Sequence, residues 1–550
     1  MYSTLTITPA KRRVAFMGDW RSSRACRLRI WCSALLMTLG GCSLQAQARS
    51  SPDSLGANLE RVTDYSRSHP FADVMKQARG FGPVDRPYDV SVPVPVGPDG
   101  WPSTDFGILF FSDGRVDTGT YKLSFEGHAD LEIVASSAML KDVTRNAAAN
   151  TTSADVVVTD RNSTLMLLFR NTGGNVKRIK LMRPGYKDET FTRVFLDHLL
   201  RFDSFRFMDW AQTNDSAVVH WSDRVALDAP TYTPRGVPWE VMIELANLLR
   251  KDVWINVPHQ ATDDYVTQLA MLFKTTLHPS LHVYVEYSNE VWNFLFGQAQ
   301  WNLAAAKAEV AADNNSPLKF DGAKDDFAIS VRRVAKRLKE ISDIFRSVYG
   351  PGAFTTRVRP VLAGQMVVPA TLEQGLLLVD RIYGPPSRYF WGVAGAPYFH
   401  VGTADSQTLS VDQLIGALST AVDQLETTQQ FDRNMAIATS SDLAFVAYEG
   451  GPDTFGPNNV AVKKAASMDP RMKDICVRYL NTWYSRGFGL FNWFIAGATN
   501  WDTPFGTWGL TDDMANQNTP KIQALDAVTA KAGKGTKAIK RNRDGALPMR

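Results

Sequence analysis

The chain has 550 residues, of which 44% are hydrophobic and 21% are charged. This length indicates several domains or one large barrel with an attachment, and the composition excludes a disordered chain, a collagen and a disulfide scaffold. The net charge of +4 is uneven, since residues 1–41 and 531–550 each carry +6 and the rest carries −8. The net positive charge lies at the two ends and the body between them is mildly acidic. This distribution is not that of a basic folded face, so we expect no nucleic-acid partner.

Residues 1–41 have the pattern of an export signal. A basic region precedes the apolar run Ile30–Leu39, which is shorter than the about 20 apolar residues of a membrane span. The run leads into Leu-Gly-Gly-Cys, which resembles the lipobox of bacterial lipoproteins and implies lipid attachment at Cys42 and an outer-membrane destination. Two alternatives stay open: ordinary cleavage after Ala48, which gives a soluble periplasmic or extracellular protein, and a start at Met17.

A short linker, 42–53, is expected to precede the first βα unit of a barrel, 54–85, with a strand at Leu55–Leu59 and a helix at Phe71–Arg79. From residue 86 to residue 186 the chain is rich in Thr, Val, Gly, Asp and Asn. Short alternating stretches separated by Gly and Asn predict an antiparallel β-sandwich. Its expected strands are Tyr121–Phe125, Leu131–Val134, Ser153–Val158, Leu165–Phe169 and Val176–Leu181.

From residue 187 to residue 530 helical and strand patterns alternate. With the first strand they give eight strands, so we predict an α/β protein: a (β/α)₈ TIM barrel with the β-sandwich inserted after the first barrel strand and helix. The seven further strands are Ser204–Trp210, Val253–Pro258, His282–Glu290, Arg359–Gly364, Gly392–Phe399, Ala444–Glu449 and Gly489–Phe494. The segment 531–550 is expected to be a disordered basic tail.

The sequence predicts neither a disulfide nor a metal site. Of four cysteines, only Cys476 lies beyond the leader and its lipidation position, and its helical surroundings indicate a core residue. The acidic pair Asp263 and Asp264 follows His259 but lacks a third ligand, so we interpret it as a helix start. Nucleophile elbow, zinc-protease and P-loop motifs are absent from the sequence, and we expect no cofactor.

Two predicted barrel strands end in glutamate, one at Glu290 and one at Glu449. Polar residues at the carboxyl ends of barrel strands are catalytic candidates. A carboxyl pair is what glycosidic bond cleavage needs, and in retaining enzymes the two groups lie about 5–5.5 Å apart. Glu286 shares the strand face of Glu290 and is an alternative acid, although its deeper position favours a buried partner of an arginine.

The pair Asn289-Glu290 together with Glu449 resembles the acid/base and nucleophile of clan A glycoside hydrolases, which are retaining (β/α)₈ enzymes. The resemblance covers about 350 residues by strand order, but only short motifs by sequence. It implies Glu290 as acid/base and Glu449 as nucleophile. Its further implied positions are Arg206, which supports the nucleophile, Tyr398, which bonds it, His259 and His400 near the sugar, and Trp493 as the floor of the sugar site. The inserted sandwich and the long segment between the two glutamates depart from the family.

Several of these positions have a structural alternative. Arg206 could serve only as a barrel ion pair, and His259 and His400 could be packing residues instead of sugar contacts. Trp210 and Trp292 follow strand ends, where an indole face suits a pyranose ring or simply packs the barrel rim.

Together these features predict an exported, lipid-anchored retaining glycoside hydrolase. Its partner would be a polysaccharide or oligosaccharide of the β-glucan, mannan or exopolysaccharide class, and we expect a monomer that meets the membrane only through its lipid. We expect Glu290 to have a raised pKa and Glu449 to be ionised. The alternatives are a non-catalytic carbohydrate-binding lipoprotein and an exopolysaccharide assembly factor. The sandwich resembles carbohydrate-binding modules, and it could equally be a structural brace.

Overall fold

The structure is a computed structural model that describes residues 54–112, 115–402 and 404–531. The expected signal segment, Cys42, the linker and all but the first residue of the basic tail lie outside these ranges. Among the described helices, none is both long and apolar enough to cross a lipid bilayer.

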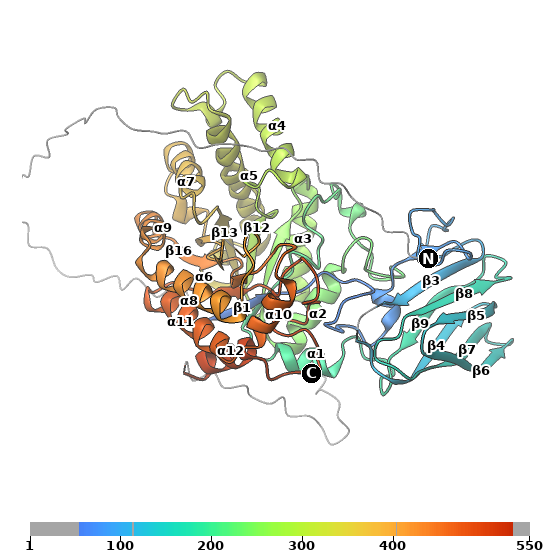
Figure 1. Ribbon diagram of the computed structural model, residues 1–550. Coiled ribbons are helices and arrows are strands. Elements are labelled where there is room, and N and C mark those ends of the chain that lie inside the picture. Colours follow the sequence, from blue (N-terminus) through green and yellow to red (C-terminus); the bar gives the residue numbers. More distant parts are fainter. Residues whose placement is uncertain (1–53, 113–114, 403, 532–550) are drawn as a thin grey trace, which may run out of the picture. The chain divides into compact units, whose positions relative to one another are not determined.

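A closed barrel of eight parallel strands forms the centre of the described chain, as predicted (Figure 1). Its first strand pairs with both the second and the last, with Gly56 opposite Ser204 on one side and Asn492 on the other, which closes the sheet. The strands are β1 (Leu55–Asn58), β10 (Ser204–Arg206), β11 (Asp252–Val257), β12 (Val283–Tyr287), β13 (Val358–Ala363), β14 (Gly392–Gly395), β16 (Ala444–Ala447) and β18 (Phe491–Trp493).

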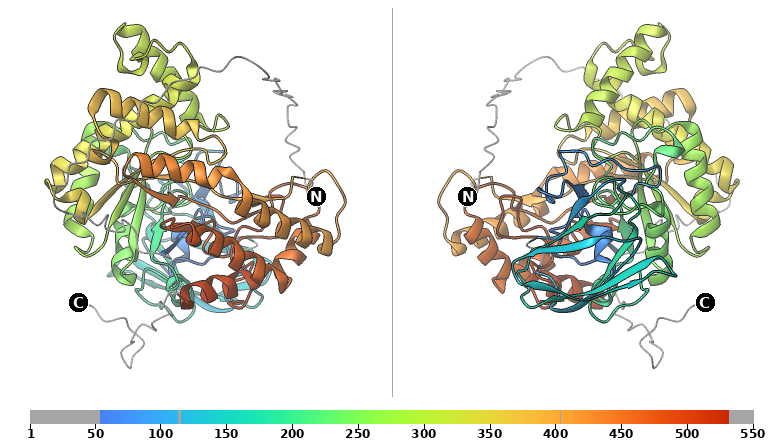
Figure 2. Two further views of the ribbon diagram at one scale, coloured as in Figure 1. Left: turned by 90° about the vertical axis from the view of Figure 1, so that its left-hand side faces the viewer. Right: turned by 90° about the vertical axis from the view of Figure 1, so that its right-hand side faces the viewer.

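Helices surround the barrel, and the green, yellow and orange ones lie outside its strands (Figures 1 and 2). Buried apolar side chains of strands and helices form one continuous core, which is the main stabilising contribution in such a fold. The α-helices are α1 (Arg193–Leu199), α2 (Trp239–Leu249), α3 (Asp263–Thr276), α4 (Gly297–Ala312), α5 (Asp326–Tyr349), α6 (Ala353–Thr356), α7 (Ala370–Tyr383), α8 (Val411–Thr427), α9 (Gln429–Ser440), α10 (Val460–Met468), α11 (Arg471–Ser485) and α12 (Pro520–Lys531). Three short 3₁₀ helices, η2 (Trp221–Asp223), η3 (Pro317–Lys319) and η4 (Pro386–Arg388), lie between them.

The inserted segment forms two antiparallel four-stranded sheets with their own hydrophobic core, as expected for a sandwich (Figure 1). One sheet has the order β2 (Phe81–Gly82), β3 (Phe106–Phe111), β8 (Leu165–Arg170), β5 (Asp130–Ala135). The other has the order β6 (Ala138–Asn146), β7 (Thr151–Val158), β4 (Gly119–Glu126), β9 (Lys177–Met182). The sequence pattern missed β3, whose six residues are all buried and do not alternate, and β6, which is largely exposed. A pair of short strands, β15 (Phe399–His400) and β17 (Pro452–Asp453), lies beyond barrel strands β14 and β16.

The segment Phe71–Arg79 is not the helix that its apolar spacing suggests. It contains only the 3₁₀ helix η1 (Val74–Gln77), and the Asp73 side chain caps its start. The same carboxylate accepts a hydrogen bond from the backbone N–H of Leu181 at 2.9 Å. Its apolar side chains are divided between two cores: Phe71 packs with the barrel, and Val74 packs with the sandwich. The spacing therefore reflects two packing surfaces, and the first α-helix after β1 is α1, which follows the sandwich. Since β2 pairs with β3, the sandwich begins before the expected boundary at residue 86.

Candidate active site

A layer of aromatic side chains fills the barrel below its carboxyl end. Trp254 stacks on Tyr284 with ring centres 5.3 Å apart, and both belong to a separate cluster of buried residues drawn from the barrel strands. The Arg206 guanidinium lies 5.0 Å from the Tyr448 ring and 5.9 Å from the Trp254 ring. This layer therefore supports the polar residues of the site from below, and it excludes water from the underside of Arg206.

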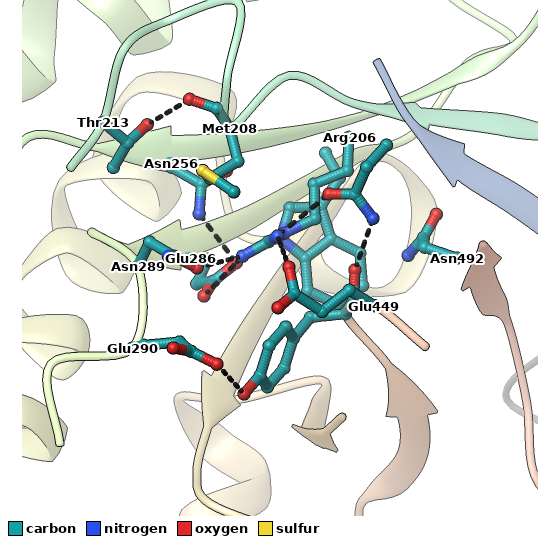
Figure 3. A network of polar contacts seen from close by, with 12 residues as sticks. Arg206, Met208, Thr213, Asn256, Glu286, Asn289, Glu290, Glu449 and Asn492 are labelled. Atoms are coloured by element: carbon teal, nitrogen blue, oxygen red, sulfur yellow. Dashed lines mark hydrogen bonds and ion pairs between the residues drawn. The ribbon is translucent and has the colours of Figure 1, made fainter. Parts of the chain in front are cut away.

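Arg206 connects two carboxylates that come from different strands (Figure 3). It is fully buried, and its Nη2 donates to Glu286 Oε2 at 2.9 Å while its Nη1 donates to Glu449 Oε2 at 3.1 Å. Further bonds go to Asn58 Oδ1 at 3.0 Å and to Asn289 Oδ1 at 2.8 Å. A buried guanidinium with this many acceptors holds all four side chains in fixed positions.

Glu286 is a buried partner of this arginine. Besides Arg206, the Trp254 indole donates to Glu286 Oε2 at 2.7 Å and the Asn256 amide donates to it at 2.8 Å. Only 1% of the Glu286 side chain is exposed, so its carboxylate is saturated with donors and closed to a ligand. Its contacts support Arg206 and give it no access to a reacting bond.

Glu449 follows β16 and presents its carboxylate at the barrel mouth. One oxygen accepts from Arg206, and the other has no hydrogen-bond partner among the described residues. The side chain is 9% exposed. The turn behind it is tight, because a Cβ at Gly450 would lie 2.7 Å from the Phe491 ring and 2.8 Å from the Tyr479 hydroxyl. The packing of this turn thus fixes where the carboxylate points.

Glu290 lies beyond the end of β12 in a left-handed backbone conformation, with φ +44°. Such a conformation is strained for a residue with a side chain and is common at functional sites. The Tyr448 hydroxyl donates to Glu290 Oε1 at 3.0 Å, and the Asn293 amide donates to Oε2 at 2.9 Å. Both donors are uncharged, in contrast to the guanidinium at Glu449.

The hydrogen-bond donors around the two carboxyls differ in charge, and this difference bears on which carboxyl holds a proton. Burial raises the pKa of Glu290, and burial followed by repulsion from Glu290 raises the pKa of Glu449 to about 8. Coupled carboxyls of this kind keep one proton between them at neutral pH. The charge of Arg206 lowers the pKa of both carboxyls, but of the two its guanidinium bonds only Glu449 and therefore favours the charged form there. With Glu290 neutral, the repulsion from Glu290 no longer raises the Glu449 pKa, and burial, the larger cause, remains.

Asn289 is held from both sides of its amide group. Its Oδ1 accepts from Arg206 and its Nδ2 donates to Asn214 Oδ1 at 3.0 Å. Gln298 at the start of α4 donates both to Asn214 Oδ1 and to the backbone carbonyl of Asn289. These bonds fix the backbone immediately before Glu290.

Tyr398 lies near both carboxylates without bonding to either of them. Burial, then the charges of Glu449 and Glu290, raise the pKa of Tyr398 well above its ordinary value. Its ring meets Phe494 edge to face at 6.1 Å. In the described part of the chain its hydroxyl forms no hydrogen bond with Glu449; the tyrosine that bonds a carboxylate is Tyr448.

The two candidate histidines occupy different surroundings. His259 is buried after β11 and packs edge to face against Trp301 at 5.3 Å, and burial lowers the pKa of its ring. Its Nδ1 is buried and has no partner among the described residues. His400 lies exposed in β15. The structure therefore places His259 in the barrel rim and His400 at the surface.

The candidate tryptophans do not form one sugar platform. Trp210 is buried in an aromatic cluster with Phe71, Phe195 and Phe207 and does not join the carboxylates. Trp493 is fully buried at the end of β18 and offers no exposed face. Trp292 is half-buried beside the Glu290 turn, and its Nε1 is an unpartnered buried donor.

Four side chains of this site were absent from the sequence-based candidates: Asn58, Trp254, Asn256 and Tyr448. Asn58 and Tyr448 lie at or just after strand ends, and Trp254 and Asn256 lie within β11. Strand parity gave no signal for Tyr448, because it directly precedes Glu449 and adjacent strand residues face opposite sides. Register was a usable signal for Asn256, which is the partner of Glu286. Among the described residues, no group of three or more His, Cys, Asp and Glu side chains is placed to hold a metal ion.

No protein-family model matches the sequence, and no curated protein does. Solved structures similar to the chain include an α-L-arabinofuranosidase from Thermotoga maritima in complex with arabinose (TM-score 0.35, 10% identity) and a GH51 α-L-arabinofuranosidase from Thermotoga petrophila (TM-score 0.35, 11% identity). Each match covers 56% of this chain and 59% of the other, so the chain spans less than two thirds of these proteins. A GH5-4 broad specificity endoglucanase from Clostridium longisporum matches with a TM-score of 0.32 and 10% identity over 60% of this chain and 99% of its own.

Proposed function

We propose that the chain is a retaining glycoside hydrolase of the clan A type that cleaves a polysaccharide by double displacement. The observation that carries the proposal is the unequal pair at the barrel mouth. Glu449 accepts a bond from a buried guanidinium, whereas Glu290 accepts only from uncharged donors. One carboxylate and one carboxylic acid facing the same space are the groups that this reaction needs.

In the proposed mechanism the free oxygen of Glu449 attacks the anomeric carbon while Glu290 transfers its proton to the departing glycosidic oxygen. A glycosyl ester on Glu449 results, and Glu290, now charged, removes a proton from the water that hydrolyses the ester. Arg206 keeps Glu449 ionised and oriented before the attack, and it stabilises the carboxylate that is released when water cleaves the ester. Asn289 and Tyr448 hold the turn and the carboxyl of Glu290.

The experiment is a hydrolysis screen of the mature protein against β-glucans, mannans, xylans and bacterial exopolysaccharides, with new reducing ends as the readout. We expect Glu449→Gln and Glu290→Gln each to lower turnover by about 10³-fold or more. The exposed Glu244→Gln on α2 is the matched control and should retain full activity. Azide should rescue the two variants to glycosyl azides of opposite anomeric configuration.

Full activity in either active-site variant would exclude the residue assignment. If the wild-type protein cleaves no polysaccharide of the panel, but it and Glu449→Gln both bind one, the result would favour the non-catalytic carbohydrate-binding lipoprotein.

We further propose export with lipid attachment at Cys42, on the support of the leader pattern alone. In the producing cell, Cys42→Ser should move the protein from the detergent-extracted membrane fraction to the soluble fraction. Mass spectrometry of the wild-type N-terminus should find a diacylglycerol adduct. A mature N-terminus after Ala48 would instead establish ordinary cleavage.

A further inference from the structure

A groove of about 850 Å³ lies outside the catalytic pair. Its walls come from three segments: residues 61–65 after β1, residues 79–100 at the start of the inserted sandwich, and residues 222–235 between β10 and α2. The volume is within the range of ligand-binding clefts in proteins. One wall therefore belongs to the insertion, and two belong to loops at the carboxyl end of the barrel, where barrel enzymes bind substrate.

The groove presents apolar side chains that a folded protein usually buries. Tyr65, Val90 and Val96 line it with 55%, 48% and 52% of their surfaces exposed. Clustered exposed apolar side chains next to polar ones mark a binding surface. A tyrosine ring is a suitable face for the C–H side of a sugar ring, and its hydroxyl adds a polar contact.

The charged side chains of the groove are nearly balanced in number. It is lined by four arginines and three aspartates: Arg61, Arg79, Arg224, Arg235, Asp64, Asp99 and Asp228. Arg79 is held by two bonds of 2.9 Å to the buried carboxylate of Asp64, and Arg224 lies 4.3 Å over the Trp221 ring. Fixed donors and acceptors of both signs suit a neutral, hydroxyl-rich ligand better than a strongly charged one.

The groove is connected to the catalytic pair through the residues after β1. Arg61, in its wall, lies three residues beyond Asn58, which accepts from Arg206, the partner of Glu449. Asp209 is a second connection. Burial raises its pKa to about 6, and the charges of Arg206 and Arg61 both act on it. The segment after β1 thus contributes both to the groove wall and to the support of the catalytic pair.

We infer that this groove binds a neutral stretch of the same polysaccharide, several sugar units from the bond that is cleaved. The inference rests on the proposed hydrolase function. In this role the inserted segment supplies part of the substrate site, and the enzyme acts on long chains in preference to short oligosaccharides.

The test compares Tyr65→Ala and Val90→Asp with Tyr88→Ala. Tyr88 is a matched control, because it lies in the same inserted segment, is 52% exposed and does not line the groove. For the polymer identified by the hydrolysis screen, we expect kcat/KM to fall about tenfold in each groove variant. Turnover of an aryl glycoside that occupies only the catalytic centre should stay unchanged, and Tyr88→Ala should match the wild type with both substrates. Circular dichroism and melting temperature check that all variants fold.

A second measurement keeps this inference separate from the proposed function. Affinity electrophoresis in gels that contain each soluble polysaccharide of the panel measures binding without turnover. If no polymer is cleaved but one retards the wild type and Tyr88→Ala more strongly than Tyr65→Ala, the groove site stands and the hydrolase proposal fails. If the groove variants match the wild type in both polymer turnover and retardation, the groove site is wrong. A loss of aryl glycoside turnover equal to the loss with polymer would also overturn it.

Discussion

The Tyr448 hydroxyl donates a 3.0 Å hydrogen bond to the carboxyl of Glu290, although Tyr448 directly precedes Glu449 in the chain. The end of β16 therefore supplies one proposed catalytic carboxylate and a donor to the other. Arg206 has the corresponding position on the opposite side, since it bonds both Glu449 and the asparagine before Glu290. Glu290 is thus oriented partly by the strand that carries Glu449, and Glu449 is oriented by Arg206 of β10, which also bonds Asn289.

The first prediction concerns Tyr448→Phe. Its hydrogen bond lowers the pKa of Glu290 against the larger effect of burial, so removing the hydroxyl should raise that pKa. Glu290 must be protonated to act as the acid, and the alkaline limb of the kcat profile should move upward by up to about one pH unit. The pH dependence of turnover measures this shift, with the exposed Tyr88→Phe as control. An unchanged or lower alkaline limb would show that the hydroxyl does not act on the catalytic acid.

The second prediction separates Glu286 from the catalytic pair by its effect on stability. Glu286→Gln leaves the buried Arg206 without its main counter-charge, and breaking a buried pair costs about 3–5 kcal/mol of unfolding free energy. The matched change Glu132→Gln removes an exposed partner of Arg170 and should cost about 0–1 kcal/mol. Urea denaturation of the three proteins measures both values. A loss at Glu286 no larger than that at Glu132 would contradict a supporting role for the buried pair.

The barrel could be predicted because each of its strands is a short, mostly apolar run between turns, and its order follows from the chain. The same apolar criterion was wrong at Phe71–Arg79, where two different cores bury the side chains and the spacing imitates a helix. Positions at strand ends made Glu290 and Glu449 candidates, and the family resemblance implied Arg206, which bonds Glu449 in the structure. Tyr448 was missed because its bond to Glu290 depends on how two strands lie across the barrel, which no local pattern records.

Trp210 is a candidate that its position in the chain suggested but that does not lie at the site. Its position after β10 suggested a sugar contact, but the chain turns at Met208–Ala211 and directs the indole into a cluster of phenylalanines. The position of a residue just beyond a strand end does not determine where its side chain points. The geometry of the following turn determines this direction, and that geometry depends on tertiary packing.

The third prediction concerns the ionic contact between the sandwich and the loop before α12. Arg161 bonds Asp513 at 2.8 Å and 3.0 Å, and Arg115 reaches the same carboxylate at 3.2 Å. These bonds lower the pKa of Asp513 to about 2. A depressed carboxyl pKa stabilises the fold above the unfolded pKa of about 3.9, and this stabilisation is lost as the pH falls through about 2. The free energy of unfolding of Asp513→Asn should therefore lie below that of the wild type at pH 6, and the difference should shrink between about pH 4 and pH 2.

Urea denaturation at a series of pH values checks this contact. The exposed Asp188→Asn serves as the control, and its difference from the wild type should not depend on pH in this window. A difference at Asp513 that stays constant down to the lowest measurable pH would mean that the carboxylate charge does not connect the sandwich to the loop.

The last prediction concerns Lys521, which is fully buried at the start of α12. Its ammonium group donates to the carbonyls of Thr507 and Gly509 and lies 4.3 Å from the Trp501 ring. Burial lowers its pKa to about 7. The unfolded chain, with a lysine pKa of about 10.4, binds more protons than the folded chain between these two values, so the free energy of unfolding should rise with pH across that window. Relative to Lys521→Met, the wild type should gain stability from pH 7 to pH 10, as urea denaturation at each pH would measure. As a control, the free energy of unfolding of the exposed Lys187→Met should change with pH as that of the wild type does. If the curve of Lys521→Met also runs parallel to that of the wild type, Lys521 is solvated or paired in the folded protein.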